Sequence, residues 1–70
     1  MKIRITKVDI DRNDGSITLE QCGFKVGDVV EVDGNFRDGT YCVLAIRETE
    51  HIRIGDNIGV DHDECEVVEE

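Results

Sequence analysis

The stretch FKVGDVVEVDGNFRDGTYCVLAI, residues 24–46, decides the fold class of this 70-residue chain. Val30 and Val32 alternate with the polar Glu31, which is the two-residue period of a strand with one buried face. The segment 40–46 is apolar at both parities, as expected of a central strand that is covered on both faces. The residues between these two patterns include Asn, Asp and Gly, which favour a tight connection. The stretch therefore predicts two β-strands joined by a turn.

Similar strand patterns lie on both sides of this stretch. The segment 2–10 alternates, but its apolar parity changes between Ile5 and Val8, which predicts a bulge or sharp bend near Thr6–Lys7. Further short strands are expected at 16–22 with Ile17 and Leu19 on one face, at 51–54 with Ile52 and Ile54 inward, at 58–60 and at 65–70. The polar segment DHDE (61–64) is expected to turn the chain, with one 3₁₀ turn before the last strand.

These segments predict an all-β fold. No segment has apolar residues that recur at the spacing of an amphipathic helix. Short strands separated by turn residues suggest a small barrel of about five to six strands. A chain of this length forms a single domain, residues 1–70. Within it, an N-terminal β-hairpin (about 2–22) is expected to lead into the barrel.

The composition narrows the range of partners. The chain has 17 acidic and 8 basic residues and a net charge of −9, which argues against direct binding to nucleic acid or to an anionic membrane surface. No apolar run approaches the ~20 residues of a membrane span, and the N-terminus has no signal-peptide pattern. We therefore expect a cytoplasmic protein (host cytoplasm if it is phage-encoded) with reduced cysteines.

Three segments carry a resemblance to a known fold. FKVGDVVEV (24–32), DGTYCVLAI (38–46) and IGVDHDECEVVEE (58–70) resemble parts of an SH3-like small β-barrel, namely the strand after the first long loop, the next hairpin strand and the closing strand–3₁₀–strand pattern. The resemblance covers roughly Phe24 to Glu69, and it is to the single barrels found in bacteria and their phages.

The resemblance does not extend to the SH3 domains that bind proline-rich peptides. Those domains carry a groove tryptophan, several further groove aromatics and a proline before the 3₁₀ turn. This chain has no tryptophan and no proline, and its aromatic residues are two phenylalanines and one tyrosine. The resemblance therefore implies the barrel architecture and does not imply binding of proline-rich peptides.

The stretch DIDRNDGSITLE (9–20) looks like an EF-hand calcium loop at first sight. With Asp9 at the first position, the required glycine and apolar residue each fall one position late, at Gly15 and Ile17. The flanking segments are also strand-like, whereas the motif lies between helices. We expect an exposed, metal-free β-hairpin connection here.

The cysteines and histidines form no recognisable metal or catalytic motif. Cys22, Cys42 and Cys65 lack the close pairing of structural zinc ligands. DHDEC (61–65) does bring carboxylates, a histidine and a cysteine together, and His51 could join them; the alternative is that Cys42 and Cys65 are small core residues. No serine or cysteine has an evident base, and so small a fold has little room for a pocket. We expect no enzyme, no catalytic residue, no metal and no cofactor.

Three kinds of function stay open. The first is a small acidic protein-interaction module, for example a phage or mobile-element accessory protein. Its contact residues would be Phe36, Arg37, Tyr41 and His51, although Phe36 and Tyr41 could instead complete the core. The second is an inhibitor that mimics nucleic acid through its C-terminal acids, which could instead form only a soluble edge that resists aggregation. These acids are Asp56, Asp61, Asp63, Glu64, Glu66, Glu69 and Glu70.

The third kind is a decoy that sequesters a small nucleotide, or a structural component of a larger assembly. The negative charge argues against an anionic ligand. A protein partner is expected for the module and for the mimic. A homo-oligomer would be compatible with every one of these functions, because self-association enlarges the buried core of a small chain.

Overall fold

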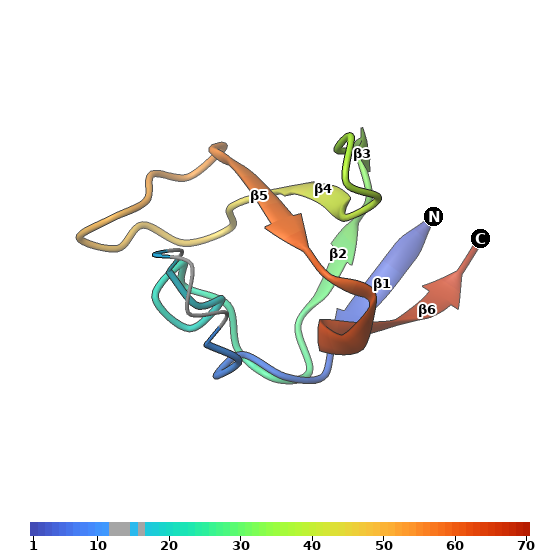
Figure 1. Cartoon of the computed structure of the whole chain (residues 1–70), viewed down its shortest axis with the longest axis horizontal. Coiled ribbons are helices and arrows are strands. Elements are labelled where there is room, and N and C mark those ends of the chain that lie inside the picture. Colours follow the sequence, from blue (N-terminus) through green and yellow to red (C-terminus); the bar gives the residue numbers. More distant parts are fainter. Residues whose placement is uncertain (12–14, 16) are drawn as a thin grey trace.

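Six short strands and one 3₁₀ turn make up the regular structure of the described residues, which are 1–11, 15 and 17–70 of the computed structural model. In chain order they are β1 (Lys2–Ile5), β2 (Val29–Glu31), β3 (Gly34–Asn35), β4 (Tyr41–Leu44), β5 (Asn57–Val60), η1 (His62–Glu64) and β6 (Cys65–Glu69). The strands form two antiparallel three-stranded sheets, with the orders β2–β1–β6 and β3–β4–β5 (Figure 1). The prediction of an all-β fold is therefore confirmed.

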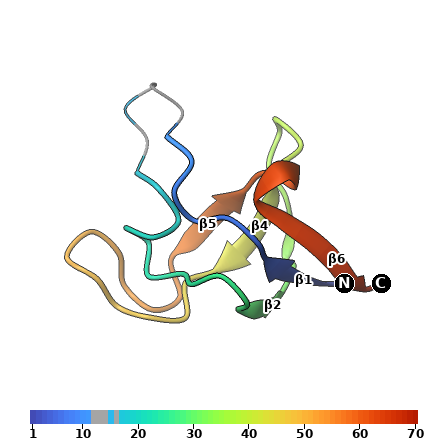
Figure 2. The same ribbon diagram turned by 90° about the horizontal axis from the view of Figure 1, so that it is seen from below.

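The first sheet is built around β1. Ile3 and Ile5 are fully buried, whereas Lys2 and Arg4 are exposed, so the strand has one face on the core. β1 pairs with β2 along one edge and with β6 along the other, where the register shifts between Lys2 and Ile3. Because β1 and β6 are neighbours, the two chain ends lie side by side in both views (Figures 1 and 2).

The chain passes from the first sheet to the second at Val32–Asp33. The Val32 N–H donates to the Met1 carbonyl oxygen beside the first sheet, and the Asp33 N–H donates to the Cys42 carbonyl oxygen in the second, each at 2.8 Å. β4 is then the central strand, paired with β3 and β5. Adjacent residues thus serve different sheets, and both sheets contribute side chains to one core.

The core combines strand residues with residues of a loop. Its buried apolar side chains are Ile3, Ile5, Leu19, Cys22, Phe24, Val30, Val43, Ala45, Ile58 and Val60. Leu19, Cys22 and Phe24 come from the turn-rich segment 17–24, where the Phe24 N–H donates to the Leu19 carbonyl oxygen at 3.0 Å. Burying a Leu or Phe side chain stabilises a fold by about 1.5–3 kcal/mol. The loop therefore contributes to stability on the same scale as the strands.

Two side chains of the long β4–β5 connection (45–56) hold it against the segment 17–28. Arg47 donates from Nη1 to the Gly23 carbonyl oxygen at 2.9 Å and forms a two-point ion pair with Asp28, at 2.6 and 3.2 Å. The Thr49 hydroxyl donates to the Gln21 carbonyl oxygen at 2.9 Å. The hydrogen bond from Arg47 lowers the pKa of Asp28, whose side chain is 14% exposed. These contacts join two loops that the sheets do not connect.

Most of the second half of the chain follows the sequence prediction. β2, β4, β5 and β6 lie at the segments predicted as strands, and η1 is the predicted 3₁₀ turn. Val30 is buried and Val32 is half-buried, as their alternation indicated. Within the described ranges there is no α-helix, and so no helix that is long and apolar enough to cross a bilayer.

The predicted N-terminal hairpin (about 2–22) includes residues 12–14 and 16, which lie outside the described residues, so the hairpin stays a prediction. β1 ends at Ile5, close to the predicted bend, where the N–H groups of Thr6 and Lys7 both approach the Glu64 carbonyl oxygen, at 2.9 and 3.3 Å. The described residues of 16–22 form no strand; residues 19–22 make turns, with Leu19 buried and Ile17 exposed. Because the core takes in Leu19 and Cys22 from a turn, β1 is left to pair with β2 and β6.

Two expectations for the second sheet also fail. The segment 51–54 is not a strand, because the Thr49 hydroxyl accepts the His51 and Ile52 N–H groups and the Asp56 carboxylate accepts that of Arg53; Ile54 is 67% exposed. The outer face of β4 is not covered, since Leu44 and Ile46 are 45% and 44% exposed. Among the described residues, no hydrogen-bonded ladder closes the two sheets into one barrel, so a small all-β fold is confirmed and the barrel is not.

Replacing Asp28 tests the ion pair with Arg47. Asp28→Asn keeps an acceptor for the Lys25 N–H, which donates at 2.8 Å, but removes the charge. Since folding lowers the pKa of Asp28 below its ordinary value of about 3.9, the stabilisation is present above that pH and is lost as the pH falls through the folded pKa. We expect a loss of up to ~1 kcal/mol at pH 7, which disappears as the pH falls below the folded pKa of Asp28. Thermal unfolding followed by circular dichroism measures this; a difference independent of pH would contradict the assignment.

Gly23 lies where the two loops come close together. Its φ is +89°, and an added Cβ would lie 3.0 Å from Thr49 Cγ2 and 3.1 Å from Arg47 Cβ. Gly27 is the matched control, since its φ is +96° but an added Cβ would meet open space. We expect Gly27→Ala to cost about 1–2 kcal/mol from backbone strain alone, and Gly23→Ala to cost a further ~1–3 kcal/mol from overpacking. Urea unfolding compares the two; equal losses would argue against a tight approach at Gly23.

Candidate functional site

A groove of about 440 Å³ lies between the segment that follows β1 and the β5–η1 region. Its apolar lining is Ile10, Ile17, Leu19, Cys22, Ile52 and Ile58, and its polar lining is Asp38, Thr40, Asn57, Asp61 and Glu64, with Gly59 between them. The expectation that this fold has little room for a pocket was wrong. Ile10, Ile17, Leu19 and Cys22, which all follow β1 in the chain, line one side of the groove.

Asp38 is held in the turn between β3 and β4. Its Oδ1 accepts hydrogen bonds from the Thr40 N–H at 3.0 Å and from the Thr40 hydroxyl at 2.8 Å. These bonds, with the backbone N–H first, lower the pKa of Asp38. The turn is closed by the Phe36 N–H, which donates to the Thr40 carbonyl oxygen at 2.9 Å. Asp38 therefore presents a fixed negative charge at one side of the groove.

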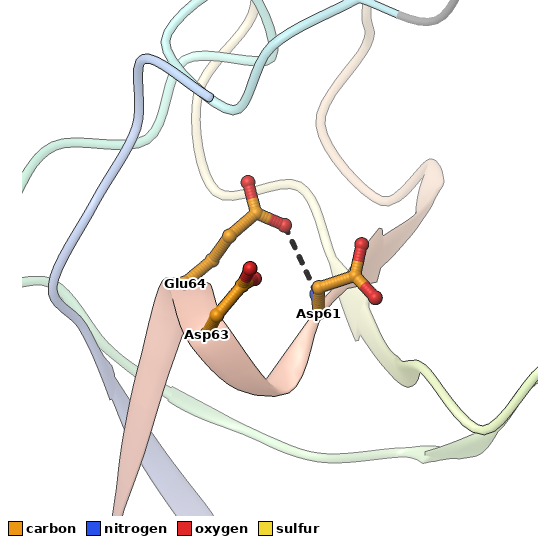
Figure 3. Close-up of side chains that lie close together, drawn as sticks. All are labelled: Asp61, Asp63 and Glu64. Carbon is orange, nitrogen blue, oxygen red and sulfur yellow. Dashed lines mark hydrogen bonds between the residues drawn. The ribbon is translucent and has the colours of Figure 1, made fainter. Parts of the chain in front are cut away.

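Asp61 and Glu64 are fixed by the 3₁₀ turn η1. The Asp61 N–H donates to Glu64 Oε1 at 3.0 Å, and the Glu64 N–H donates to the Asp61 carbonyl oxygen at 3.0 Å (Figure 3). This is one half of a capping box, in which an acidic residue three positions after the cap reaches back to its N–H. Glu64 is only 5% exposed as a result, yet it still lines the groove.

A cluster of three carboxylates surrounds this turn. Oxygen atoms of Asp61, Asp63 and Glu64 lie within 4.8 Å of one another (Figure 3). Such oxygen atoms suit calcium or magnesium, whereas zinc favours the nitrogen and sulfur of His and Cys. All three residues also have interactions within the fold.

His62 and Cys65 do not join this cluster. The His62 ring stacks on Tyr41 with centroids 4.6 Å apart, and its Nε2 lies 2.9 Å from the Gly39 carbonyl oxygen. Since a carbonyl only accepts, Nε2 carries the hydrogen of this bond. The Cys65 thiol donates to the Asp61 carbonyl oxygen at 3.5 Å. The set of zinc ligands that DHDEC suggests is therefore not formed by these described residues. His62 instead contacts Tyr41 and Gly39, and Cys65 donates to the backbone of Asp61.

The four residues proposed from the sequence as protein contacts are not all together. Phe36 and Arg37 line an open depression beside Gly59, and Phe36 is 41% exposed. Tyr41 is half-buried, and it packs against the core as well as against His62. His51 lies in the β4–β5 connection next to Glu50. In the ribbon views, this connection extends away from the β3–β4 turn (Figures 1 and 2).

The seven C-terminal acids proposed for nucleic-acid mimicry do not share one exposed surface. Glu64 is buried, and Glu66 pairs with Arg4 at 2.7 Å. Asp56 accepts the Arg53 N–H at 2.9 Å in the long connection. Asp61, Asp63, Glu69 and Glu70 complete the set: Asp61 is half-buried and the other three are exposed.

The cysteines are all free thiols, and Cys22 is buried beside the groove. Burial, and then the nearby Glu64 charge, raises the pKa of Cys22; the same two causes come first for Cys65. The thiolate is the nucleophilic form, so both cysteines are poor nucleophiles at neutral pH. Cys42 lies in β4, with its Sγ 3.7 Å from Asn57 Oδ1. Cys65 packs against the core, as the alternative interpretation of the sequence expected.

Part of the stretch that resembles a calcium loop lies outside the described residues, namely 12–14 and 16. The hypothesis of an exposed, metal-free connection over 9–20 therefore stays a prediction. What the sequence analysis missed is the role of Asp38 and Glu64 in a groove. The pattern D-x-x-E at 61–64 could have indicated that Glu64 turns back to cap η1. No local pattern connects Asp38 with that turn.

Two substitutions at Glu64 separate its structural role from its charge. Glu64→Gln keeps an acceptor for the Asp61 N–H, because Gln also serves in a capping box, whereas Glu64→Ala removes it. We expect Glu64→Ala to lose about 1 kcal/mol or more of unfolding free energy and Glu64→Gln to lose clearly less. Urea unfolding at neutral pH gives both values. Equal losses would show that the charge, and not the capping bond, holds Glu64 in place.

The groove offers an apolar floor and carboxylates with fixed positions, and within the described residues its lining includes no serine, histidine, lysine or arginine. The thiol that borders it is held protonated. Compared with known proteins, the chain matches no family model, no curated protein and no solved structure.

Proposed function

We propose that this chain is an SH3-like protein-interaction module that binds an extended, cationic segment of a partner protein in the acidic groove. The SH3-like assignment is supported by three features. The strand orders are β2–β1–β6 and β3–β4–β5, the chain passes between sheets at Val32–Asp33, and a 3₁₀ turn precedes the last strand. The contact surface differs from that expected from the sequence, because the groove is lined by other residues.

The observation that carries the proposal is the composition of the groove. Asp38, Asp61 and Glu64 line it together with apolar side chains, and among the described residues (1–11, 15 and 17–70) no lysine or arginine lines it. A cationic side chain of a partner would meet these carboxylates at a site partly shielded from water, where charge interactions are stronger than in bulk solvent. The net charge of −9 also accelerates the encounter with a basic partner.

The same composition makes other occupants less suitable. A polyproline helix is recognised by aromatic side chains, and the groove lining includes none. A nucleotide would bring phosphate charge towards three carboxylates, so the decoy function has less support. Mimicry of nucleic acid has less support as well, because two of its acids, Glu64 and Glu66, are buried or already paired.

Two synthetic hexapeptides test the proposal in an NMR titration of the native chain. One alternates Leu and Lys, and the other alternates Leu and Glu, so that only the sign of the charge differs. We expect saturable amide shifts at groove residues such as Leu19 and Gly59 with the Leu–Lys peptide, and no saturable shifts with the Leu–Glu peptide. Because the interaction is electrostatic, the affinity should fall several-fold as salt is raised from low to physiological concentration.

A matched pair of variants locates the charge that matters. Glu64→Gln keeps the capping bond and should weaken Leu–Lys binding about 5- to 30-fold, as expected for the loss of ~1–2 kcal/mol. Glu69→Gln is the control, since Glu69 is exposed on β6 and does not line the groove. No saturable binding of the Leu–Lys peptide would refute the proposal. An equal loss in both variants would instead favour the C-terminal acidic edge as the binding surface.

A further inference from the structure

The open edge of β5 runs along the groove. β5 ends the sheet order β3–β4–β5, so it pairs with β4 on one side and with no strand of the described residues on the other. Among the described residues, the strand residues that line the groove are Asn57, Ile58 and Gly59, all of β5. An open edge presents backbone N–H and C=O groups with which another strand can pair. The edge of β5 therefore belongs to the groove as well as to the sheet.

The hydrogen bonds of β4 show which backbone groups of β5 point away from it. In an antiparallel pair, residues whose N–H and C=O groups bond to the partner strand alternate with residues whose groups point to the other side. The Cys42 carbonyl oxygen accepts the Asp33 N–H at 2.8 Å, so Cys42 bonds towards the β3 side. Gly59 lies opposite Cys42. These two residues therefore form a pair without hydrogen bonds, and the N–H and C=O groups of Gly59 point to the open edge.

Asn57 is the second residue whose backbone groups point to this edge. The Ala45 N–H donates to the Asp56 carbonyl oxygen at 2.8 Å, so Asp56 bonds towards β4 and the next residue, Asn57, points its groups away. Asn57 and Gly59 are both exposed, and outside the strand ladders no backbone hydrogen bond among the described residues uses either of them. Each residue has one N–H and one carbonyl oxygen. The edge thus offers donors and acceptors at the two-residue spacing that an added strand requires.

The carboxylates of the groove lie near the Gly59 end of this edge. Asp61 follows Gly59 by two residues, and Asp61 and Asp38 also line a smaller depression together. Arg37 of the β3–β4 turn lines the neighbouring depression beside Phe36 but does not line the groove. A strand added to β5 would therefore bring its side chains close to negative charge at one end.

We propose that the cationic partner segment joins β5 as a fourth strand of the three-stranded β3–β4–β5 sheet, with main-chain hydrogen bonds to Asn57 and Gly59. This inference rests on the function proposed above and specifies the partner further. The partner is an extended segment with apolar residues for the groove floor and a Lys or Arg for the carboxylates. It has no proline at the residues that pair, because proline has no N–H to donate. Main-chain bonds then give affinity, and the groove side chains give selectivity.

Amide hydrogen exchange of the native chain, with and without the Leu–Lys hexapeptide, tests the pairing. We expect the Asn57 and Gly59 amides to exchange about ten-fold or more slowly at saturating peptide, because each then donates to the peptide backbone. Val67 on β6, the edge strand of the other sheet, is the control. The Glu64 carbonyl oxygen accepts the Thr6 N–H, so Val67, three residues on, points away from β1 by the same alternation. Its exchange should stay unchanged.

Two N-methylated forms of the same peptide test whether the bonds come from its main chain. In an extended peptide the N–H groups of alternate residues point to opposite edges, so one form is methylated on its Leu amides and the other on its Lys amides. Only one of these edges can face β5. We therefore expect one form to bind about ten-fold or more weakly than the other, as for the loss of one or two hydrogen bonds.

The possible results distinguish strand addition from groove binding in general. Saturable binding without slower exchange at Asn57 and Gly59 overturns strand addition and leaves groove binding in place. Equal affinities of the two methylated peptides do the same. Slowing at Val67 as large as that at Gly59 also overturns strand addition, because it reports a rise in the stability of the whole fold. No saturable binding of the unmodified peptide overturns both proposals.

Discussion

Strand length is the constraint on which the rest of this structure depends. The strands are two to five residues long, so the sheets alone cannot enclose the buried core of the described residues. The segments 17–28 and 45–56 close the remaining sides. Arg47 holds these segments together by reaching Asp28 and the Gly23 carbonyl oxygen at once. The two loops must therefore be ordered to keep water out of the core. Arg47 has a structural role, although its side chain is 40% exposed.

The groove is a consequence of the same closure. Leu19, Cys22 and Ile58 belong both to the core and to the groove lining, so an occupant would rest on side chains whose other surfaces pack inside the molecule. Glu64 connects the two roles as well, because it caps η1 and presents a buried carboxylate to the groove. A ligand that binds only the folded chain raises its stability. In so small a domain, the groove and the core thus share residues, so the binding that we propose would depend on the same side chains as folding.

The sequence was informative where a local pattern decides the structure and uninformative where distant segments do. Alternation predicted β2, and the polar DHDE predicted η1, because a short strand and a turn depend on neighbouring residues. Apolar and polar residues alternate in the segment 17–22 as in a strand, but Leu19 and Cys22 are buried in the core from a turn. Burial against distant residues decided the structure here, and the local alternation did not. The groove carboxylates at 38, 61 and 64 are far apart in the chain, and only the fold brings them together. The segment 40–46 is apolar on both faces, but this pattern likewise does not indicate whether both faces are covered in the folded chain.

The pairing of β1 with β6 sets the order of events during synthesis. Lys2 lies opposite Glu69 and Ile5 opposite Cys65, so the central strand of the first sheet has to wait for a partner at least 60 residues further along the chain. Until residues 65–69 have left the ribosomal exit tunnel, one edge of β1 has open backbone groups and the core residues Ile3 and Ile5 lack part of their cover. Non-local pairing of this kind folds slowly for the size of the chain. While that edge of β1 is unpaired, the negative charge of the chain helps to keep it soluble and opposes edge-to-edge association.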